Sequence, residues 1–311
     1  MNVYRNWDNI SIDNAAVTLG TFDGVHLGHK FVCNQLIYKA KAIDGCSVVI
    51  TFYPHPRIVL NQAKDLKLIQ SIEEKIETFK KVGIDHLVII PFDEKWADLN
   101  AEDFLKEVFS KIRPKAFYLG YDHKFGKNRE GNIQLVEKLS KTYSYQCEVL
   151  KEFEVLKNVS STNIRTLIKA GEITKANQLL DQPFSMSGTI VKGQQIGHTI
   201  SFPTANIDLQ DEYKIVPAIG AYAVIVHHKG EQYKGMLNIG FRPTVNGKEL
   251  SIEVHIIDFN KQIYGDKLTV RFIERIRTEI RFETIESLKI QLIKDKNASN
   301  EILSAIYPIN I

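Results

Sequence analysis

The chain lacks the features that would mark a membrane, secreted or nucleic-acid-binding protein. Its 311 residues hold no apolar run of membrane length and no signal peptide, so we expect a cytoplasmic protein. The net charge of +3 is too small to indicate a nucleic-acid surface. Cysteine is scarce as well. Cys33, Cys46 and Cys147 form no CxxC pair and leave an odd number, which predicts free thiols in a reducing compartment.

The composition is otherwise that of an ordinary globular protein. Hydrophobic residues make up 44% of the sequence and charged residues 25%. Low-complexity segments and internal repeats are absent from the sequence. The length suggests about two domains, each able to bury its own core. Function must therefore be sought in local motifs.

One glycine-bearing stretch, GTFDGVHLGH at residues 20–29, organises the first half. It follows an apolar run at 15–19 that predicts a buried strand and precedes a predicted helix at 30–42. A turn from strand to helix leaves free backbone N–H groups, and the helix N-terminus adds positive charge, so phosphate binds well there. His26 and His29 share one face of this turn, where the alternative is that they are helix-cap or surface residues. We expect neutral imidazoles that donate to phosphate oxygens, because the positive helix end disfavours their protonation.

The first half alternates strand-like and helix-like segments. Strands are predicted at 47–53, 86–92 and 116–119, and helices at 71–82, 101–112 and 133–143. This order favours a parallel sheet covered on both faces, with ligands at the carboxyl ends of the strands.

Three further stretches follow predicted strand ends or open a helix. TFYPHP at 51–56 carries His55 in a loop that two prolines fix, although a plain strand terminator explains it equally well. GYDHKFGKNREG at 120–131 offers glycines and cationic side chains to an anion, where the alternative is a solvated loop. SSTNIR at 160–165 lets hydroxyls, backbone amides and Arg165 converge at a helix start, where an ordinary cap is the alternative.

The second half changes character near Pro183, after a short predicted helix at 171–182. Its segments are short, rich in β-branched residues and broken by turn signals at 229–230, 246–247 and 264–266, which predicts an antiparallel sheet or small barrel. A helix is predicted at 284–294. Gly188 and Gly193 have the glycine spacing of a Walker A loop, but Gln194 and Gln195 replace its Lys and Ser/Thr, so that interpretation fails.

A different phosphate cradle is predicted at FPTAN, residues 202–206. Thr204 and Asn206 project from one side of a rigid segment, and their oxygens suit Mg²⁺ when phosphates supply the remaining charge. A polar strand edge is the alternative. Further on, the alternation around Glu253 places it opposite the aliphatic residues of its strand. Inside a barrel mouth, Glu253 could act as a general base. On the outside it would be a solvated residue without that role.

Together these stretches resemble the HxGH nucleotidyltransferase superfamily and, in the long form GxFDGxHxGH, the bacterial riboflavin kinase/FAD synthetase family. The matching elements TFxPHP, GxDFxFGxxRxG, SSTxIR, PTAN, NIGxRPT, ExH and LRxExxF occur in the family's order between residue 17 and about residue 299. The chain departs from the family pattern at four positions: His123, His198, Ser201 and Gln262.

The resemblance implies an α/β plus β fold. Residues 1–182 would form a Rossmann-like nucleotidyltransferase domain with a parallel sheet, and residues 183–311 a small antiparallel β-barrel with a C-terminal helix. It also implies two Mg²⁺-dependent reactions: the C-terminal domain phosphorylates riboflavin with ATP to give FMN, and the N-terminal domain adenylylates FMN with ATP to give FAD and pyrophosphate. We expect a monomer or weak homo-oligomer with no nucleic-acid or membrane partner.

The resemblance assigns a role to each candidate residue. The catalytic residues would be His26, His29 and Glu253. The ATP-binding and phosphate-binding residues would be Gly20, Phe22, Asp23, Gly28, Ser161, Thr162, Arg165, Gly193, Thr204 and Asn206, with Thr204 and Asn206 also as metal ligands. The flavin-binding residues would be His55, Asp122, Phe125, Arg129 and Arg277.

Three alternatives remain at this point. A synthetase with an inactive kinase module is suggested by the changes at His198, Ser201 and Gln262. Another HxGH enzyme, such as a pantetheine-phosphate adenylyltransferase, would explain the first half but neither 203–206 nor Glu253. A non-enzymatic flavin-binding protein would need neither paired histidines nor a general base.

Overall fold

The computed structural model describes residues 1–311 except 64, 121–123, 151–158, 194–201, 245–246 and 307–311. The chain forms two compact units, which are described separately here. The N-terminal unit comprises residues 1–66 and 72–161, and the barrel unit comprises residues 67–71 and 162–311. The domain boundary expected after residue 182 stays a prediction.

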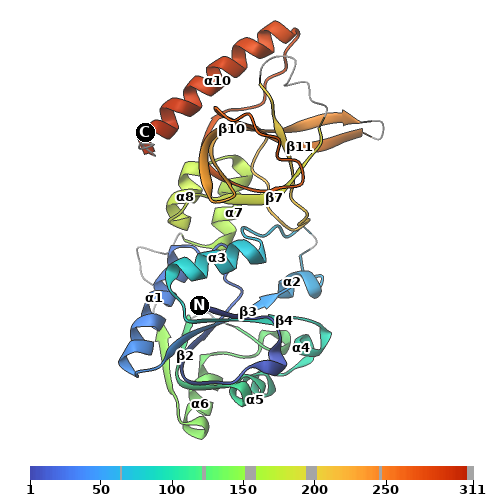
Figure 1. The fold of residues 1–311 in the computed structure, drawn as a ribbon. Coiled ribbons are helices and arrows are strands. Elements are labelled where there is room, and N and C mark those ends of the chain that lie inside the picture. Colours follow the sequence, from blue (N-terminus) through green and yellow to red (C-terminus); the bar gives the residue numbers. More distant parts are fainter. Residues whose placement is uncertain (64, 121–123, 151–158, 194–201, 245–246, 307–311) are drawn as a thin grey trace. The chain divides into compact units, whose positions relative to one another are not determined.

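A six-stranded parallel sheet forms the centre of the N-terminal unit, as predicted (Figure 1). Its strand order is β1-β4-β3-β2-β5-β6, and each neighbouring pair is parallel. The strands are β1 (Asn2–Tyr4), β2 (Ile12–Leu19), β3 (Cys46–Tyr53), β4 (His86–Pro91), β5 (Ile112–Gly120) and β6 (Gln146–Leu150). The signature stretch follows β2, which lies between β3 and β5 and is therefore well inside the sheet.

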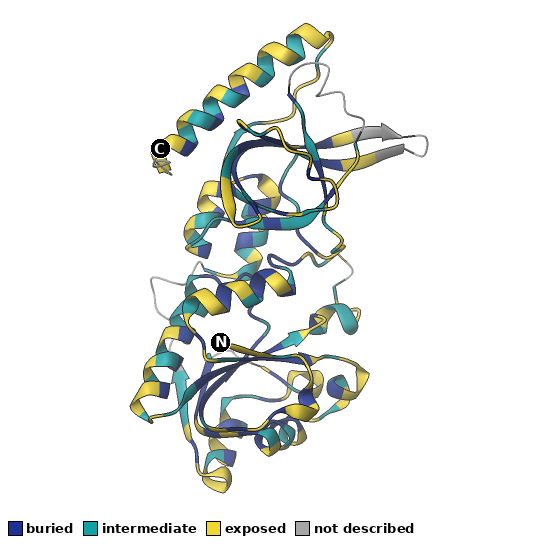
Figure 2. Ribbon diagram, in the orientation of Figure 1, coloured by how far each residue is buried: buried dark blue, intermediate teal, exposed yellow. Residues whose placement is uncertain are grey.

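Helices cover both faces of this sheet. They are α1 (Leu27–Ala42), α2 (Pro56–Val59), α3 (Ile72–Val82), α4 (Glu94–Asp98), α5 (Ala101–Lys111) and α6 (Ile133–Tyr143). Alternate strand residues belong to two cores: Val17 and Val48 pack with α5 residues, whereas Ala16 and Val49 pack with residues of α1 and α3. Figure 2 shows the buried central strands between these layers.

Several element boundaries differ from the sequence prediction. Helix α1 begins at Leu27 rather than at residue 30, so His29 lies inside its first turn. Strand β5 begins at Ile112 and is longer than the predicted 116–119. The short elements β1, β6, α2 and α4 were not predicted, because three to five residues carry too little periodicity to identify them.

The barrel unit contains a closed antiparallel barrel, which confirms the predicted class. Its strand order is β10-β11-β8-β7-β12-β9. The strands are β7 (Ser185–Val191), β8 (Ala205–Asp208), β9 (Gly220–His228), β10 (Glu231–Thr244), β11 (Gly247–Ile256) and β12 (Lys267–Arg277). Lys229 and Gly230 both have positive φ and connect β9 to β10, as the turn signal predicts.

Helices α7 (Ser161–Ala170), α8 (Ile173–Leu180) and α10 (Ile285–Ile306) accompany the barrel. The prediction of a helix at 284–294 was too short, because α10 continues for another twelve residues. Its second half is held by contacts distant in sequence: Leu303 packs with Ala223, Ile225 and Ile273 of the barrel. The periodicity that predicts a helix weakens there, because Lys294, Asp295 and Lys296 interrupt the apolar spacing.

Candidate functional site

The two signature histidines lie stacked at the start of α1. Their ring centroids are 3.7 Å apart and the ring planes differ by 17°. His26 is the N-cap residue of α1, and a Cβ on Gly28 would come within 3.3 Å of its ring. The glycine therefore makes room for the stacked pair, and the prediction that both histidines share one face is confirmed.

Phe22 packs against one ring of this histidine pair. Its ring packs edge-on against His29 at 5.1 Å and against Phe79 of α3 at 5.5 Å. Phe22 and Val25 have φ values of +46° and +39°, which side chains rarely adopt, so the turn is strained on both sides of Asp23. Gly20 lies so close to the Phe22 ring that a Cβ there would approach it to 3.1 Å. The turn thus places buried aromatic contacts where the phosphate site is predicted.

His29 is held as a neutral ring. Its Nδ1 is buried and has no hydrogen-bond partner among the residues that the structure describes. Burial lowers the pKa of His29 well below its ordinary value, and the charges of His26 and Lys75 lower it further. The predicted neutral state therefore holds for His29, but burial is its main cause, whereas the sequence analysis attributed it to the helix N-terminus.

Lys75, on α3, was missed by the sequence analysis. Its side chain is 6% exposed, and its Nζ donates a hydrogen bond to the Thr21 carbonyl at 2.7 Å. The available signal was its position: Lys75 lies three residues after Ile72 and four before Phe79, on the apolar face of an amphipathic helix. A lysine at this position departs from the apolar pattern of that helix face.

Ser161 connects the SSTNIR stretch to the signature turn. Its hydroxyl donates to the Asp23 carbonyl at 2.8 Å, and the Asp23 side chain is only 2% exposed. Ser161, the last residue of the N-terminal unit, therefore lies beside the signature turn. Thr162 and Arg165 lie on α7 in the barrel unit, and their roles at the triphosphate stay predictions.

His55 and the loop after β5 lie at the carboxyl ends of their strands, as predicted. His55 is 7% exposed and is the N-cap of α2, where its Nδ1 accepts a hydrogen bond from the Arg57 backbone N–H. A neutral ring with an accepting Nδ1 carries its hydrogen on Nε2. Residues 121–123, directly after β5, are not among the described residues. The prediction for Asp122 and the departure at His123 therefore lie outside the described part of the chain.

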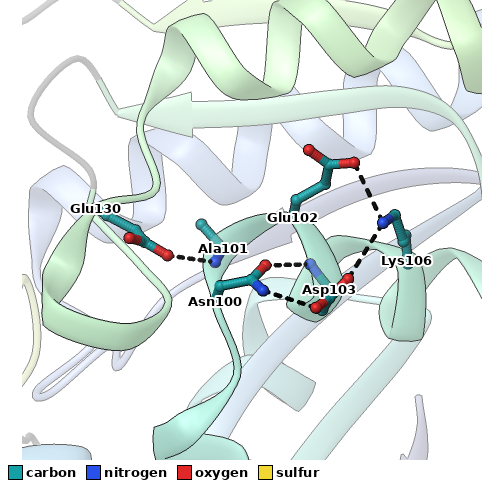
Figure 3. A network of polar contacts seen from close by, with 6 residues as sticks. All are labelled: Asn100, Ala101, Glu102, Asp103, Lys106 and Glu130. Carbon is teal, nitrogen blue, oxygen red and sulfur yellow. Dashed lines mark hydrogen bonds and ion pairs between the residues drawn. The ribbon is translucent and has the colours of Figure 1, made fainter.

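The described part of that loop is anchored to the start of α5. Gly126 has a φ of +73°, and a Cβ there would approach the Ala101 Cα to 2.7 Å, so a glycine is required. Figure 3 shows the carboxylate of Glu130 accepting a hydrogen bond from the Ala101 N–H at 3.0 Å, beside the Asn100 cap of the same helix. The Phe125 ring is buried against Phe104, and Arg129 is exposed.

The kinase candidates Thr204, Asn206 and Glu253 lie together on the barrel. The Thr204 hydroxyl donates to one carboxylate oxygen of Glu253 at 3.0 Å, and the Ser251 hydroxyl donates to the other at 2.9 Å. Asn206 lies directly opposite Glu253 in the pairing of β8 with β11. Residues up to 49 positions apart in the sequence thus form one polar cluster.

Asn206 has an oxygen suited to a cation. The residue is 7% exposed, and its Oδ1 is buried without a hydrogen-bond partner in the described part of the chain. Gly193 lies beside it, since a Cβ on Gly193 would come within 2.0 Å of the Asn206 Nδ2. An unsatisfied amide oxygen on the residue opposite Glu253, whose carboxylate the Thr204 hydroxyl contacts, fits the predicted Mg²⁺ ligand set.

Glu253 lies on the outer face of the barrel. The sequence analysis expected a general-base role only if Glu253 lay inside the barrel mouth, and this condition needs correction. Ile252 and Val254 pack in the barrel core with Leu237, so Glu253 points the other way. It is nevertheless only half-exposed and accepts two hydrogen bonds. The expectation that an outer face means a solvated carboxylate was wrong, because the segment that carries Thr204 covers this part of the strand.

Comparison with known proteins agrees with this division into two sites. The FAD synthetase family model matches residues 9–163, and the riboflavin kinase model matches residues 180–303. The bifunctional riboflavin kinase/FMN adenylyltransferase of Listeria monocytogenes is 36% identical over 296 residues, covering 93% of this chain and 92% of the relative. This chain belongs to the bifunctional riboflavin kinase/FMN adenylyltransferase family. The Bacillus subtilis member is also 36% identical, over 286 residues.

A solved structure described as a macrolide-efflux protein from Streptococcus pneumoniae has the same fold. Its TM-score is 0.84 at 30% identity, and the match covers 96% of this chain and 98% of that one. Within the described residues of this riboflavin kinase/FMN adenylyltransferase family member, no helix is long and apolar enough to cross a membrane. The presence of the riboflavin kinase domain favours the bifunctional interpretation over a synthetase with an inactive kinase module.

In the riboflavin kinase domain, His255 supports the polar cluster. Its Nδ1 lies 2.8 Å from the Pro203 carbonyl, and because a carbonyl only accepts, Nδ1 carries the hydrogen. Burial lowers the pKa of His255, and its ring packs against Phe202 at 5.3 Å. The sequence analysis noted His255 only as part of the ExH element. The structure assigns it to holding the segment that carries Thr204.

Arg277, predicted to bind flavin, is paired with helix α10. Its guanidinium contacts both carboxylate oxygens of Asp295, with Nη2 at 2.7 Å from Oδ2 and Nε at 3.0 Å from Oδ1. Asp295 is 2% exposed, so the pair is buried. Its flavin-binding role stays a prediction. Of the departures from the family pattern, Gln262 is described, in the loop before β12, whereas His198 and Ser201 lie outside the described residues.

Proposed function

We propose that this chain makes FAD in two steps at two separate sites. The barrel unit transfers the γ-phosphoryl group of ATP to the 5′-hydroxyl of riboflavin, giving FMN. The N-terminal unit then joins FMN to the adenylyl group of a second ATP and releases pyrophosphate. The observation that carries the proposal is the presence of two polar clusters in one chain, one around Glu253 and one around the stacked His26 and His29.

In the kinase step Glu253 acts as general base. Its carboxylate accepts hydrogen bonds from Thr204 and Ser251, which fix its orientation, and it takes the proton of the 5′-hydroxyl as that oxygen attacks the γ-phosphorus. Thr204 and Asn206 hold Mg²⁺, which when bound neutralises charge on the ATP phosphates. Gly193 lets the Asn206 amide pack against the backbone, because a Cβ there would come within 2.0 Å of the Asn206 Nδ2.

In the adenylyl transfer step the N-terminal unit positions two phosphates and stabilises charge. The FMN phosphate attacks the α-phosphorus of ATP in line, so no covalent enzyme intermediate is needed. His26 and His29 donate hydrogen bonds to the α-phosphate as negative charge builds on it. Gly20, Phe22, Asp23 and Gly28 shape the turn around these oxygens.

The remaining predicted residues complete the two binding sites in this proposal. The β- and γ-phosphates are held by Ser161, Thr162 and Arg165, and the flavin by His55, Asp122, Phe125, Arg129 and Arg277. The partners are the small molecules riboflavin, FMN and ATP, with no nucleic acid, and the protein is a monomer or weak homo-oligomer. It works in the cytoplasm, where its free cysteines would remain reduced.

One assay tests the proposal. The purified chain is incubated with riboflavin, ATP and Mg²⁺, and the flavins are separated by chromatography. FMN and FAD should both form, and both should disappear when Mg²⁺ is chelated. Untouched riboflavin with conversion of supplied FMN would leave only the synthetase activity. Tight flavin binding without either product would refute both steps and favour a binding protein.

A further inference from the structure

Lys75 is a buried charge at a position that packing alone would fill with an apolar side chain. It is 6% exposed and lies between Ile72 and Phe79 on the inner face of α3. Burying an ammonium group costs stability unless the charge is paired or used. The pKa of Lys75 is lowered to about 8, chiefly by burial, while the Asp23 carboxylate opposes that shift. The presence of a lysine here therefore requires an explanation.

The ammonium group contacts the signature turn directly. Its Nζ donates to the Thr21 carbonyl at 2.7 Å, and the Thr51 hydroxyl donates to the same carbonyl at 3.3 Å. Thr21 immediately precedes Phe22, the residue whose positive φ starts the strained part of the turn. One turn further along α3, Phe79 packs under the Phe22 ring. Helix α3 thus supports the turn through one polar and one apolar contact.

The charge also acts on His29. Its Nδ1 is buried without a hydrogen-bond partner among the described residues, so the ring gains no hydrogen bond there that would favour its charged form. The charged groups that lower the pKa of His29 are His26 on α1 and Lys75 on α3, and the charged group that acts on Lys75 is Asp23 in the turn. Two rings stacked at 3.7 Å and a buried ammonium whose charge reaches His29 do not all carry charge together.

We propose that Lys75 is a positioning residue of the adenylyl transfer site: its buried ammonium holds the Thr21 carbonyl and adds positive charge to the turn that carries His29. This inference rests on the proposed function. The ammonium attracts the ATP phosphates without touching them, and the neutral rings supply directional donors. His29 then enters each cycle in one protonation state across the neutral pH range. Without the charge, burial still lowers the pKa of His29, but less far, and the turn loses electrostatic attraction for phosphate.

Two variants separate the charge from the hydrogen bond. Lys75→Gln keeps a donor for the Thr21 carbonyl but removes the charge, whereas Lys75→Arg keeps both. We expect FAD formation from FMN to fall about tenfold or more in Lys75→Gln, which corresponds to one pKa unit of electrostatic interaction, and to stay within about threefold in Lys75→Arg. Formation of FMN from riboflavin in the same samples should be unchanged, and the fluorescence of Trp7 and Trp96 should show that the N-terminal unit is folded.

A second readout does not depend on activity. In protein with isotope-labelled histidine, NMR titration should give His29 a pKa well below 6.5 in the wild type and Lys75→Arg, and a pKa closer to 6.5 in Lys75→Gln. The wild-type His29 signal should also shift near pH 8 as Lys75 loses its proton, even if Lys75→Gln fails to fold. Wild-type FAD formation and an unchanged His29 pKa in Lys75→Gln, or no shift near pH 8, overturn the inference. A wild type that makes no FAD refutes the proposed function instead.

Discussion

The Thr204 hydroxyl donates a hydrogen bond to the Glu253 carboxylate at 3.0 Å, and the two residues come from different segments of the barrel unit. A carboxylate that accepts from Thr204 and Ser251 has a defined orientation before substrate arrives. The same threonine is the proposed Mg²⁺ ligand. A hydroxyl has lone pairs besides its O–H, so Thr204 could hold the metal and still donate to Glu253.

Replacement of Glu253 by Gln should stop FMN formation and spare FAD formation. Glutamine keeps the size and one acceptor oxygen but is not a base, so we expect a loss of about 10²-fold to 10⁴-fold in riboflavin phosphorylation. Conversion of supplied FMN to FAD in the same sample should equal the wild-type rate. Ser251→Ala is the matched control, because it removes one orienting hydrogen bond and keeps the base, so its loss should be smaller. Equal losses in both variants would contradict the general-base role.

Replacement of His29 by Ala should have the opposite effect. A donor aimed at developing phosphate charge typically contributes a factor of about 10² to 10³, so FAD formation from FMN should fall by that amount while riboflavin phosphorylation continues. His86→Ala is a suitable control, since His86 is a half-buried histidine in the same unit that begins β4 at the amino end of the sheet. Loss of both activities in soluble, folded His29→Ala would refute the division of labour.

Because Lys75 is buried, we expect the stability of the N-terminal unit to rise with pH above 8. Its pKa is about 8 in the folded chain against an ordinary 10.5, a difference of 2.5 units. Between these values the unfolded chain binds a proton that the folded chain lacks, so the free energy of unfolding increases with pH by roughly 3 kcal/mol. The cost of burying the charge is fully present below pH 8 and absent above 10.5.

Urea unfolding of the wild type and Lys75→Met at pH 7.5 and 10.5 measures this effect. The two tryptophans of the sequence, Trp7 and Trp96, are in contact in the N-terminal unit, so tryptophan fluorescence reports the unfolding of that unit alone. The wild type should gain about 3 kcal/mol relative to Lys75→Met over this range. The same pH response in both proteins would show that the lysine is not a buried charge.

Local patterns explain what could be predicted and what could not. The parallel sheet, the barrel and the groups around His26 and Thr204 follow from periodicity and from motifs whose residues are close in sequence. Lys75 was missed because its contact with Thr21 spans 54 residues, and a lysine on a helix is ordinarily solvated. The environment of Glu253 was misjudged because strand alternation shows which face a side chain takes but not which distant segment covers it.

The length of helix α10 could not be predicted from local sequence patterns either, because the contacts that hold its second half come from the barrel. The Arg277 guanidinium meets Asp295 in a buried ion pair, with side chains that are 15% and 2% exposed. Replacing Asp295 by Asn leaves an unpaired buried guanidinium, so we expect a loss of about 3–5 kcal/mol in the stability of the docked helix. Hydrogen exchange measured by mass spectrometry over residues 285–306 would detect this as faster exchange.

The matched control is Asp258→Asn. Asp258 also pairs with a cation, Lys296 of α10, but the two charged atoms are 3.7 Å apart and the Asp258 side chain is 87% exposed. An exposed pair contributes about 0–1 kcal/mol, so exchange in α10 should hardly change in this variant. If the two variants exchange alike, burial is not what makes the Arg277–Asp295 pair important. If Asp295→Asn also lowers riboflavin phosphorylation while Asp258→Asn does not, the docked helix supports the predicted flavin contact of Arg277.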